Sequence, residues 1–190
     1  MSNALISFLK SFKDIPKGDE ELLESIIEKR TYNEDEFLLK ENTVAQEMFF
    51  ICKGILKIVM LNDKGEEMTY FFLKENQFCT ILNSFNNQSI STEGIKAACS
   101  AEVIVLPRVK LLEVFKQLPY IKELIGEITQ QALLDKIQVR NNYIGQDAAT
   151  RYKMFTTNQP EIALRVSIRD IASYLGVTPQ SLSRIRKNIQ

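Results

Sequence analysis

The stretch that most narrows the fold is residues 166–189, VSIRDIASYLGVTPQSLSRIRKNI. Apolar residues recur here at helical spacing, and Ser167 followed by Asp170 has the pattern of a capped helix start. Gly176 then supplies a residue that tolerates the left-handed backbone with which helices commonly end. Two short helices joined through such a glycine turn predict a helix-turn-helix.

The second helix of this motif is predicted to begin after Thr178, a good capping residue, with Pro179 at its first position. Its periodicity turns Leu182 and Ile185 inward and leaves a polar side, with no acidic residue along it. Because Gln, Ser and Arg hydrogen-bond base edges and Arg and Lys hold phosphates, we expect this side to contact DNA. Arg184 is the expected base reader, since its forked donors match guanine, and a phosphate contact is the alternative. The predicted DNA-binding residues are Arg169, Thr178, Gln180, Ser181, Ser183, Arg184 and Lys187.

Charge is distributed unevenly along the chain. The 24 basic and 24 acidic residues cancel overall. Residues 151–190, however, hold seven Lys and Arg against two acidic residues, a net charge of +5, which leaves −5 on the preceding 150 residues. A basic end on an acidic body is the asymmetry expected when that end meets a polyanion.

Composition argues against several other classes of protein. The chain has no histidine, which removes the commonest general base and the commonest zinc ligand. Its three cysteines, Cys52, Cys79 and Cys99, are far apart and form no CxxC pair, so we expect buried free thiols rather than disulfides or a metal site. We therefore expect no enzyme activity, no catalytic residues and no bound metal.

No targeting or membrane segment is evident in the sequence. No apolar run approaches the ~20 residues that cross a bilayer. The first twenty residues have the pattern of a short amphipathic helix and lack the features of a signal peptide. We therefore expect a cytoplasmic protein.

The residues before the helix-turn-helix divide into a strand-rich body and a helical connection. Short β-type runs separated by turn residues extend from 31 to 107, with a hairpin turn at 62–65 and a turn or bulge at Gly54, and they predict an antiparallel barrel or sandwich in an α+β fold. The helices expected around this body are 3–12, 19–30 with Asp19 as its cap, 108–118, 119–144 and 146–156, followed by a polar loop over 156–165.

The long helix predicted over 119–144 carries two apolar stripes. A surface helix needs only one such stripe, so the second implies a second partner. We expect one stripe to cover the chain's own barrel and the other to pack against the same helix of a second subunit, the alternative being a helix enclosed within one chain. The predicted dimerisation residues are Ile121, Leu124, Ile128, Leu134 and Ile137.

This layout resembles the Crp/Fnr family of bacterial regulators along nearly the whole chain. The strongest match is DIASYLGVTPQSLSRIRK, residues 170–187, which is similar to the family's DNA-reading motif. The run MFFICKGILKIVMLNDKGEEMTYFFLKENQF, residues 48–78, is similar to the family's barrel. The resemblance implies a cyclic-nucleotide-binding-like jelly-roll (double-stranded β-helix) sensor domain over 1–118, a dimerisation helix over 119–144 and a DNA-binding helix-turn-helix domain over 145–190.

The resemblance also implies a function. It indicates a homodimeric transcription factor whose partners are double-stranded DNA, a small-molecule effector and RNA polymerase. The alternative is a small-molecule-binding jelly roll whose helix-turn-helix is vestigial or binds protein. A jelly-roll enzyme of the cupin type conflicts with the absence of histidine.

Two departures from the family pattern matter. Relatives that bind cyclic AMP carry Gly-Glu after a Phe and later Arg-Thr-Ala or Arg-Ser-Ala, whereas here residues 79–81 after Phe78 read Cys-Thr-Ile and no Arg occurs between Arg30 and Arg108. A buried phosphate without a cation loses a strong charge-assisted hydrogen bond, and Lys96 can replace the arginine only by pointing inward, so we expect no cofactor and no cyclic AMP. The sequence also ends at Gln190, where the β-hairpin wing of a winged helix is expected to be missing.

Overall fold

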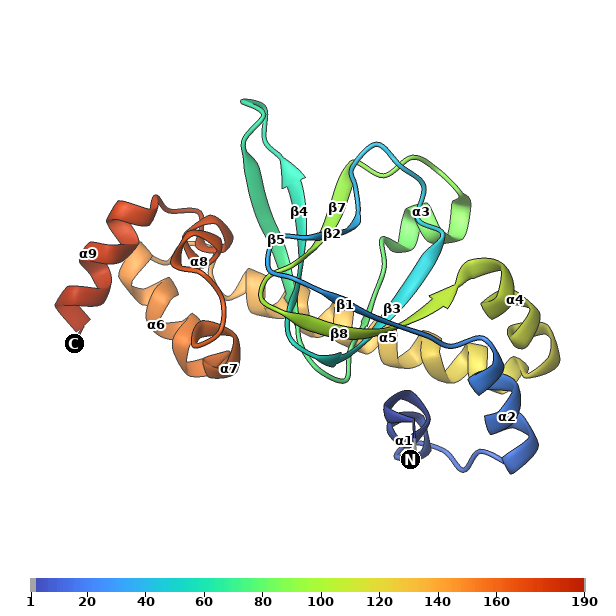
Figure 1. The fold of residues 1–190 in the computed structure, drawn as a ribbon. Coiled ribbons are helices and arrows are strands. Elements are labelled where there is room, and N and C mark those ends of the chain that lie inside the picture. The colour runs from blue at the N-terminus through green and yellow to red at the C-terminus, as the bar shows by residue number, and fades with distance from the viewer. Residues whose placement is uncertain (1–2, 190) are drawn as a thin grey trace.

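The computed structural model describes residues 3–189 and has an α+β architecture (Figure 1). A β-barrel occupies the middle of the molecule, one group of helices gathers at one end and a second group lies beyond the opposite end. The outermost residues of the first and third expected domains, 1, 2 and 190, lie outside the described residues.

The barrel consists of two four-stranded antiparallel sheets, which is the expected jelly roll. Their strand orders are β1-β8-β3-β6 and β2-β7-β4-β5. Apart from the paired strands β4 and β5, consecutive strands alternate between the two sheets, whose apolar faces pack against each other. The strands are β1 (Glu28–Tyr32), β2 (Phe37–Leu39), β3 (Glu47–Lys53), β4 (Leu56–Leu61), β5 (Glu67–Leu73), β6 (Phe78–Cys79), β7 (Glu93–Ala97) and β8 (Ala101–Pro107).

Strand β3 explains why the sequence is so apolar near residue 50. Phe49 and Ile51 point into the barrel, whereas Phe50 points outward and packs against Phe8 of helix α1 (Ala4–Lys10), with ring centroids 5.2 Å apart. A strand covered on both faces needs apolar residues at successive positions rather than at alternate ones.

The predicted turns are confirmed. Gly54 joins β3 to β4 with φ +98°, and a Cβ there would lie 2.5 Å from the carbonyl oxygen of Ser100, so only glycine fits. The β4–β5 hairpin closes at residues 62–65, where the Asn62 N–H donates to the Glu66 carbonyl at 2.9 Å and Gly65 has φ +75°.

Several helix boundaries differ from the sequence prediction. Helix α2 (Lys17–Ser25) is preceded by Pro16 at the cap position, so the expected cap at Asp19 is wrong. Residues 28–30, expected as helix, belong to β1 because they pair with β8. The sequence prediction missed α3 (Leu82–Asn87), and α7 (Pro160–Ala163) occupies part of the expected loop.

Helix α5 (Pro119–Asn141) runs behind the barrel and connects the two ends of the molecule (Figure 1). Its first turns complete an apolar core with α1, α2 and α4 (Arg108–Gln117). Ile121 is fully buried and Leu124 is 8% exposed within the chain, so their expected role at a subunit interface is wrong. Ile128 is half-buried against the same core, whereas Leu134 and Ile137 are exposed.

The thiols only partly match the prediction. Cys79 is buried inside the barrel, and this burial raises its pKa to about 12, as expected for an inert core thiol. Cys52 and Cys99 are free but half-buried. Within residues 3–189, no group of three side chains could hold a metal ion, and no helix is long and apolar enough to cross a bilayer.

Candidate nucleic-acid interface and sensor cavity

The C-terminal unit contains the predicted helix-turn-helix, with α8 (Ile168–Leu175) followed by α9 (Pro179–Ile189). The Ser167 hydroxyl caps α8 by accepting the Asp170 N–H at 3.1 Å. Gly176 has the expected left-handed conformation, with φ +67°, and its N–H donates to the Ser173 carbonyl. The Thr178 hydroxyl accepts the N–H of the residue three positions later and so caps α9.

The packing of α9 separates an apolar side from a polar side. Leu182 is fully buried, and it joins Ala172 and Leu175 of α8 and Phe155 of α6 (Ala148–Asn158) in one apolar cluster. Ile185 is half-buried on the same side. The residues of α9 and its cap that were predicted to contact DNA are all exposed: Thr178, Gln180, Ser181, Ser183, Arg184 and Lys187.

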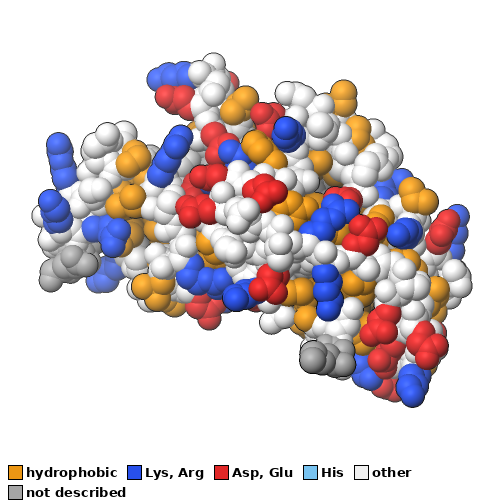
Figure 2. All heavy atoms as spheres, viewed as in Figure 1, with side chains coloured by type: hydrophobic (Ala, Val, Ile, Leu, Met, Phe, Trp, Pro, Cys, Tyr) orange, Lys and Arg blue, Asp and Glu red, His pale blue; other side chains and the backbone are white. Residues whose placement is uncertain are grey.

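Arg169 lies apart from this polar side. It belongs to α8 and lines a polar cavity at the junction with the barrel, together with Asp35. The structure therefore brings together the predicted DNA contacts of α9 but places Arg169 in a different environment. Figure 2 shows basic side chains over the end of the molecule that contains α9, whereas most acidic side chains on this face lie over the barrel and the opposite end.

A second candidate site is a cavity of about 240 Å³ between the barrel and α5. Ile58 and Tyr70 contribute to its apolar walls. Thr80 and Ile81, which stand where cyclic AMP-binding relatives were expected to carry Gly-Glu, also line it. Lys96 does not, because it pairs with Glu67 and stacks on Phe37 outside this cavity, so no arginine substitute enters from β7.

The cation at this cavity is Lys136, which sequence reasoning missed. Thr129, Ala132, Leu133 and Lys136 all line the cavity and follow the i, i+3, i+4, i+7 spacing of one helix face. A search for stripes of apolar residues does not find this face, because Thr129 and Lys136 at its two ends are polar.

Lys136 is held in place without a carboxylate partner. Its Nζ donates to the Gln77 Oε1 at 3.1 Å and forms no ion pair with any carboxylate of residues 3–189. Burial lowers the pKa of Lys136 because the ammonium group has lost part of its hydration. An anion entering the cavity would replace that hydration.

Comparison with known proteins agrees with this architecture. The model of the cyclic nucleotide-binding domain family matches residues 29–118. The transcriptional activator protein Anr of Pseudomonas protegens is 22% identical over an alignment of 187 residues, and the match covers 90% of this chain and 75% of Anr.

Solved structures share nearly the whole fold. The c-di-GMP-responsive global regulator CLP of Xanthomonas campestris superposes with a TM-score of 0.71 at 16% identity, covering 92% of each chain. FixK2 of Bradyrhizobium japonicum gives 0.73 at 18% identity, covering 86% of this chain and 84% of FixK2. A regulator described as a putative Crp/Fnr family member from Eubacterium rectale gives 0.69 at 16% identity, covering 97% and 88%.

The fold and the two sites define a class of protein: a cyclic nucleotide-binding-type jelly roll joined by a long helix to a helix-turn-helix. Residues 29–118 match the cyclic nucleotide-binding domain family, and the chain as a whole is similar to the transcriptional activator Anr and to a structure described as a putative Crp/Fnr family regulator.

Proposed function

We propose that this protein regulates transcription by placing α9 in the major groove of double-stranded DNA. The observation that carries this proposal is the separation of sides on α9. Leu182 is fully buried, while Gln180, Ser181 and Arg184 are exposed at the start and middle of the helix. A recognition helix meets base edges mainly through such N-terminal residues, and basic side chains around it hold phosphates.

Selection from a pool of random DNA duplexes tests this proposal. We expect enrichment of a near-palindromic site and a binding constant that falls steeply as salt rises, because phosphate contacts release counterions. Failure to enrich any sequence, together with binding that does not depend on salt, would contradict it and favour a helix-turn-helix that contacts protein.

We also propose that the protein acts as a homodimer through the C-terminal half of α5. Leu134 and Ile137 are 52% and 42% exposed, and Ile144, just beyond the helix, is 76% exposed. The spacing of three residues places Leu134 and Ile137 on one seam of α5, as in paired helices. A twofold arrangement about this seam would present two recognition helices about 34 Å apart, one turn of DNA.

The effector that we propose is a small apolar carboxylic acid rather than a cyclic nucleotide. Most of the cavity between the barrel and α5 is apolar, and Lys136 supplies a cation without a carboxylate partner. A carboxylate would form a charge-assisted hydrogen bond with Lys136 while its apolar part fills the cavity. A cyclic nucleotide would bring a ribose and a phosphate to a site that has neither the Gly-Glu pair after Phe78 nor an arginine. The carboxylate that does line the cavity, Glu93, already accepts hydrogen bonds from the hydroxyls of Ser91 and Thr92.

A thermal-shift comparison of octanoate, octanol, octylamine and cyclic AMP tests the effector class. We expect octanoate to raise Tm by about 2–4 °C and the other three compounds to have little effect, because only octanoate fits both the cavity and its charge. Lys136→Met should abolish the shift, whereas Lys122→Met, at an exposed position of the same helix, should preserve it. Equal shifts with octanol, or a shift with cyclic AMP alone, would contradict the proposal.

The cellular location and the interaction with RNA polymerase that we propose follow from the proposed activity. A regulator of this kind works in the cytoplasm, where it meets the genome, and acts on transcription by contacting RNA polymerase or by excluding it from the site. Neither action requires the protein to catalyse a reaction.

A further inference from the structure

The helix-turn-helix unit is packed onto the outside of the barrel rather than suspended from α5. Ile55, Phe72 and Ala98 of the barrel share one apolar cluster with Phe155 and Ile171 of the C-terminal unit. The rings of Phe72 and Phe155 have centroids 6.3 Å apart. The two units therefore have a common core as well as a covalent connection.

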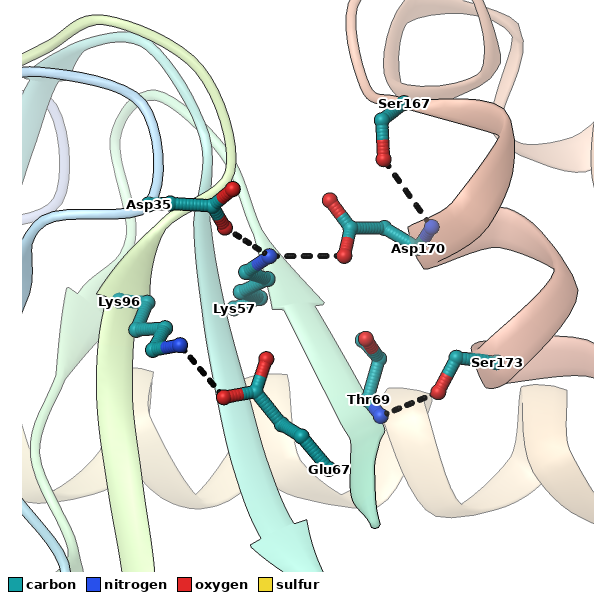
Figure 3. A network of polar contacts seen from close by, with 8 residues as sticks. All are labelled: Asp35, Lys57, Glu67, Thr69, Lys96, Ser167, Asp170 and Ser173. Carbon is teal, nitrogen blue, oxygen red and sulfur yellow. Dashed lines mark hydrogen bonds and ion pairs between the residues drawn. The ribbon is translucent and has the colours of Figure 1, made fainter.

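Beside this core, a lysine of the barrel joins two carboxylates from different parts of the chain (Figure 3). The Lys57 Nζ in β4 lies 2.7 Å from Oδ1 of Asp35 and 2.7 Å from Oδ1 of Asp170. Asp35 lies in the loop before β2, whereas Asp170 belongs to α8. The second ion pair therefore crosses from the barrel to the helix-turn-helix.

The crossing pair is almost completely removed from solvent. The side chains of Lys57 and Asp170 are 2% and 9% exposed, whereas that of Asp35 is 64% exposed. Burial by itself would lower the pKa of Lys57, but the carboxylates of Asp170 and Asp35 outweigh it and raise the pKa, so the lysine stays charged. Because a buried charge is costly without its partner, removing one member is far more disruptive than replacing both.

Two further polar contacts join the same surfaces. The Thr69 N–H of β5 donates to the Ser173 Oγ of α8 at 2.8 Å (Figure 3). Arg165, just before α8, donates two hydrogen bonds to the Glu75 carboxylate, at 3.0 and 2.6 Å. The docked position of α8 is thus specified at several points around Lys57.

The strands that hold α8 also form a wall of the sensor cavity. Lys57 and Thr69 contact α8, whereas their chain neighbours Ile58 and Tyr70 line the cavity. Successive residues of a strand face opposite sides of its sheet, so β4 and β5 have one face toward each site.

We infer that the Lys57–Asp170 pair is an interdomain latch that holds α8, and with it α9, in one position on β4 and β5. In the dimer proposed above, on which this consequence rests, the latch fixes the separation of the two recognition helices. A ligand that moves β4 and β5 from inside the cavity changes the latch without touching the helix-turn-helix.

Hydrogen–deuterium exchange on the full chain tests the latch directly. We expect Lys57→Met to accelerate amide exchange in residues 168–175 and at Thr69 by about tenfold or more, because the docked surface opens locally. The matched control is Lys96→Met. Lys96 lines the same polar cavity of about 210 Å³ between the barrel and α8, but its ion pair with Glu67 stays within the barrel.

Exchange in β3 and β8 distinguishes release of the latch from loss of the fold. Exchange in these two strands should stay slow in Lys57→Met. If it becomes fast, that variant has lost its fold, and Asp170→Asn is used in its place, because Asn removes the charge and keeps the shape of the side chain. The double variant K57M/D170M should restore slow exchange at 168–175, since an apolar pair can replace a buried ion pair. Exchange at 168–175 that is unchanged in both single variants, or equally fast in Lys96→Met, would overturn the inference.

A DNA measurement tests the consequence separately. With a selected palindrome, wild-type protein should discriminate by about tenfold or more against spacers altered by two base pairs, because the separation of its helices is fixed. Lys57→Met should bind the altered spacers within about threefold of the original, whereas Lys96→Met should behave as wild type. Absence of DNA binding in every variant would refute the proposed function, and the exchange experiment would still test the latch. If Lys57→Met discriminates between spacers as well as the wild type does, the latch does not set the separation of the recognition helices.

Discussion

Arg184 is exposed on α9, while Leu182, two residues earlier, is fully buried against α8. Within a helix, this relation follows from periodicity alone, and the prediction that Arg184 points outward is confirmed. Contact between Arg184 and a base stays a prediction, since it depends on DNA.

Arg184→Ala is expected to weaken binding to the selected operator by ~1–3 kcal/mol and to relax the base preference at one position of each half-site, because a forked donor pair to guanine is lost. Fluorescence anisotropy with the operator and with single-base variants measures both effects. Arg186→Ala is the matched comparison, since it is also exposed on α9 and should weaken all sequences alike. Loss of affinity without any change in base preference would make Arg184 a phosphate contact.

The position of Lys136 in the wall of the sensor cavity could not be predicted from residue patterns. Its spacing from Thr129 follows one helix face, yet a lysine on a helix normally indicates a solvated side. Only the barrel packed against that face turns the position into the wall of a cavity.

Helix α5 has different environments along its length. Its first turns are buried with the N-terminal helices, its middle faces the sensor cavity and its last turns expose Leu134 and Ile137. The sequence predicted two stripes, but it named Ile121 and Leu124 as dimerisation residues although both are buried within the chain. Apolar periodicity shows that a face is covered and does not show which element covers it.

The double variant L134E/I137E is expected to convert the proposed dimer into a monomer, because facing glutamates would repel each other and remain hydrated. Sedimentation velocity measures the change. Val109→Glu, at an apolar position of α4 that is 65% exposed, provides the control and should leave the mass unchanged. A double variant that stays dimeric would place the subunit interface on another surface.

At the scale of the whole molecule, the two units are joined by polar contacts that respond to acid. Arg165 beside Glu75 lowers the pKa of that carboxyl from 4.5 to about 2, with added hydrogen bonds from backbone N–H groups, including that of Gly54. A carboxyl whose pKa is depressed in the folded state stabilises the protein above its unfolded pKa, and this contribution is lost as pH falls from about 4.5 toward 2.

Glu75→Gln is therefore expected to lower the free energy of unfolding at pH 7 by about 1–3 kcal/mol, and this difference should shrink steadily as pH falls from about 4.5 toward 2. Urea unfolding at several pH values measures the two curves, which should converge on acidification. Curves that stay parallel between pH 7 and pH 2.5 would show that the Glu75 contact contributes no pH-dependent stability.

The sequence by itself determined the local elements: the turn at Gly54, the hairpin at 62–65, the capped helix-turn-helix and the exposed side of α9. Each depends on backbone preferences or periodicity within a few residues, which the chain carries wherever it lies. The tertiary structure alone decided that Asp170, predicted as part of a helix start, reaches Lys57 across 113 positions, and that residues 28–30 form a strand. Both outcomes arise from partners distant in the chain, and a buried charge or a strand edge is stabilised only by the partner that folding brings to it.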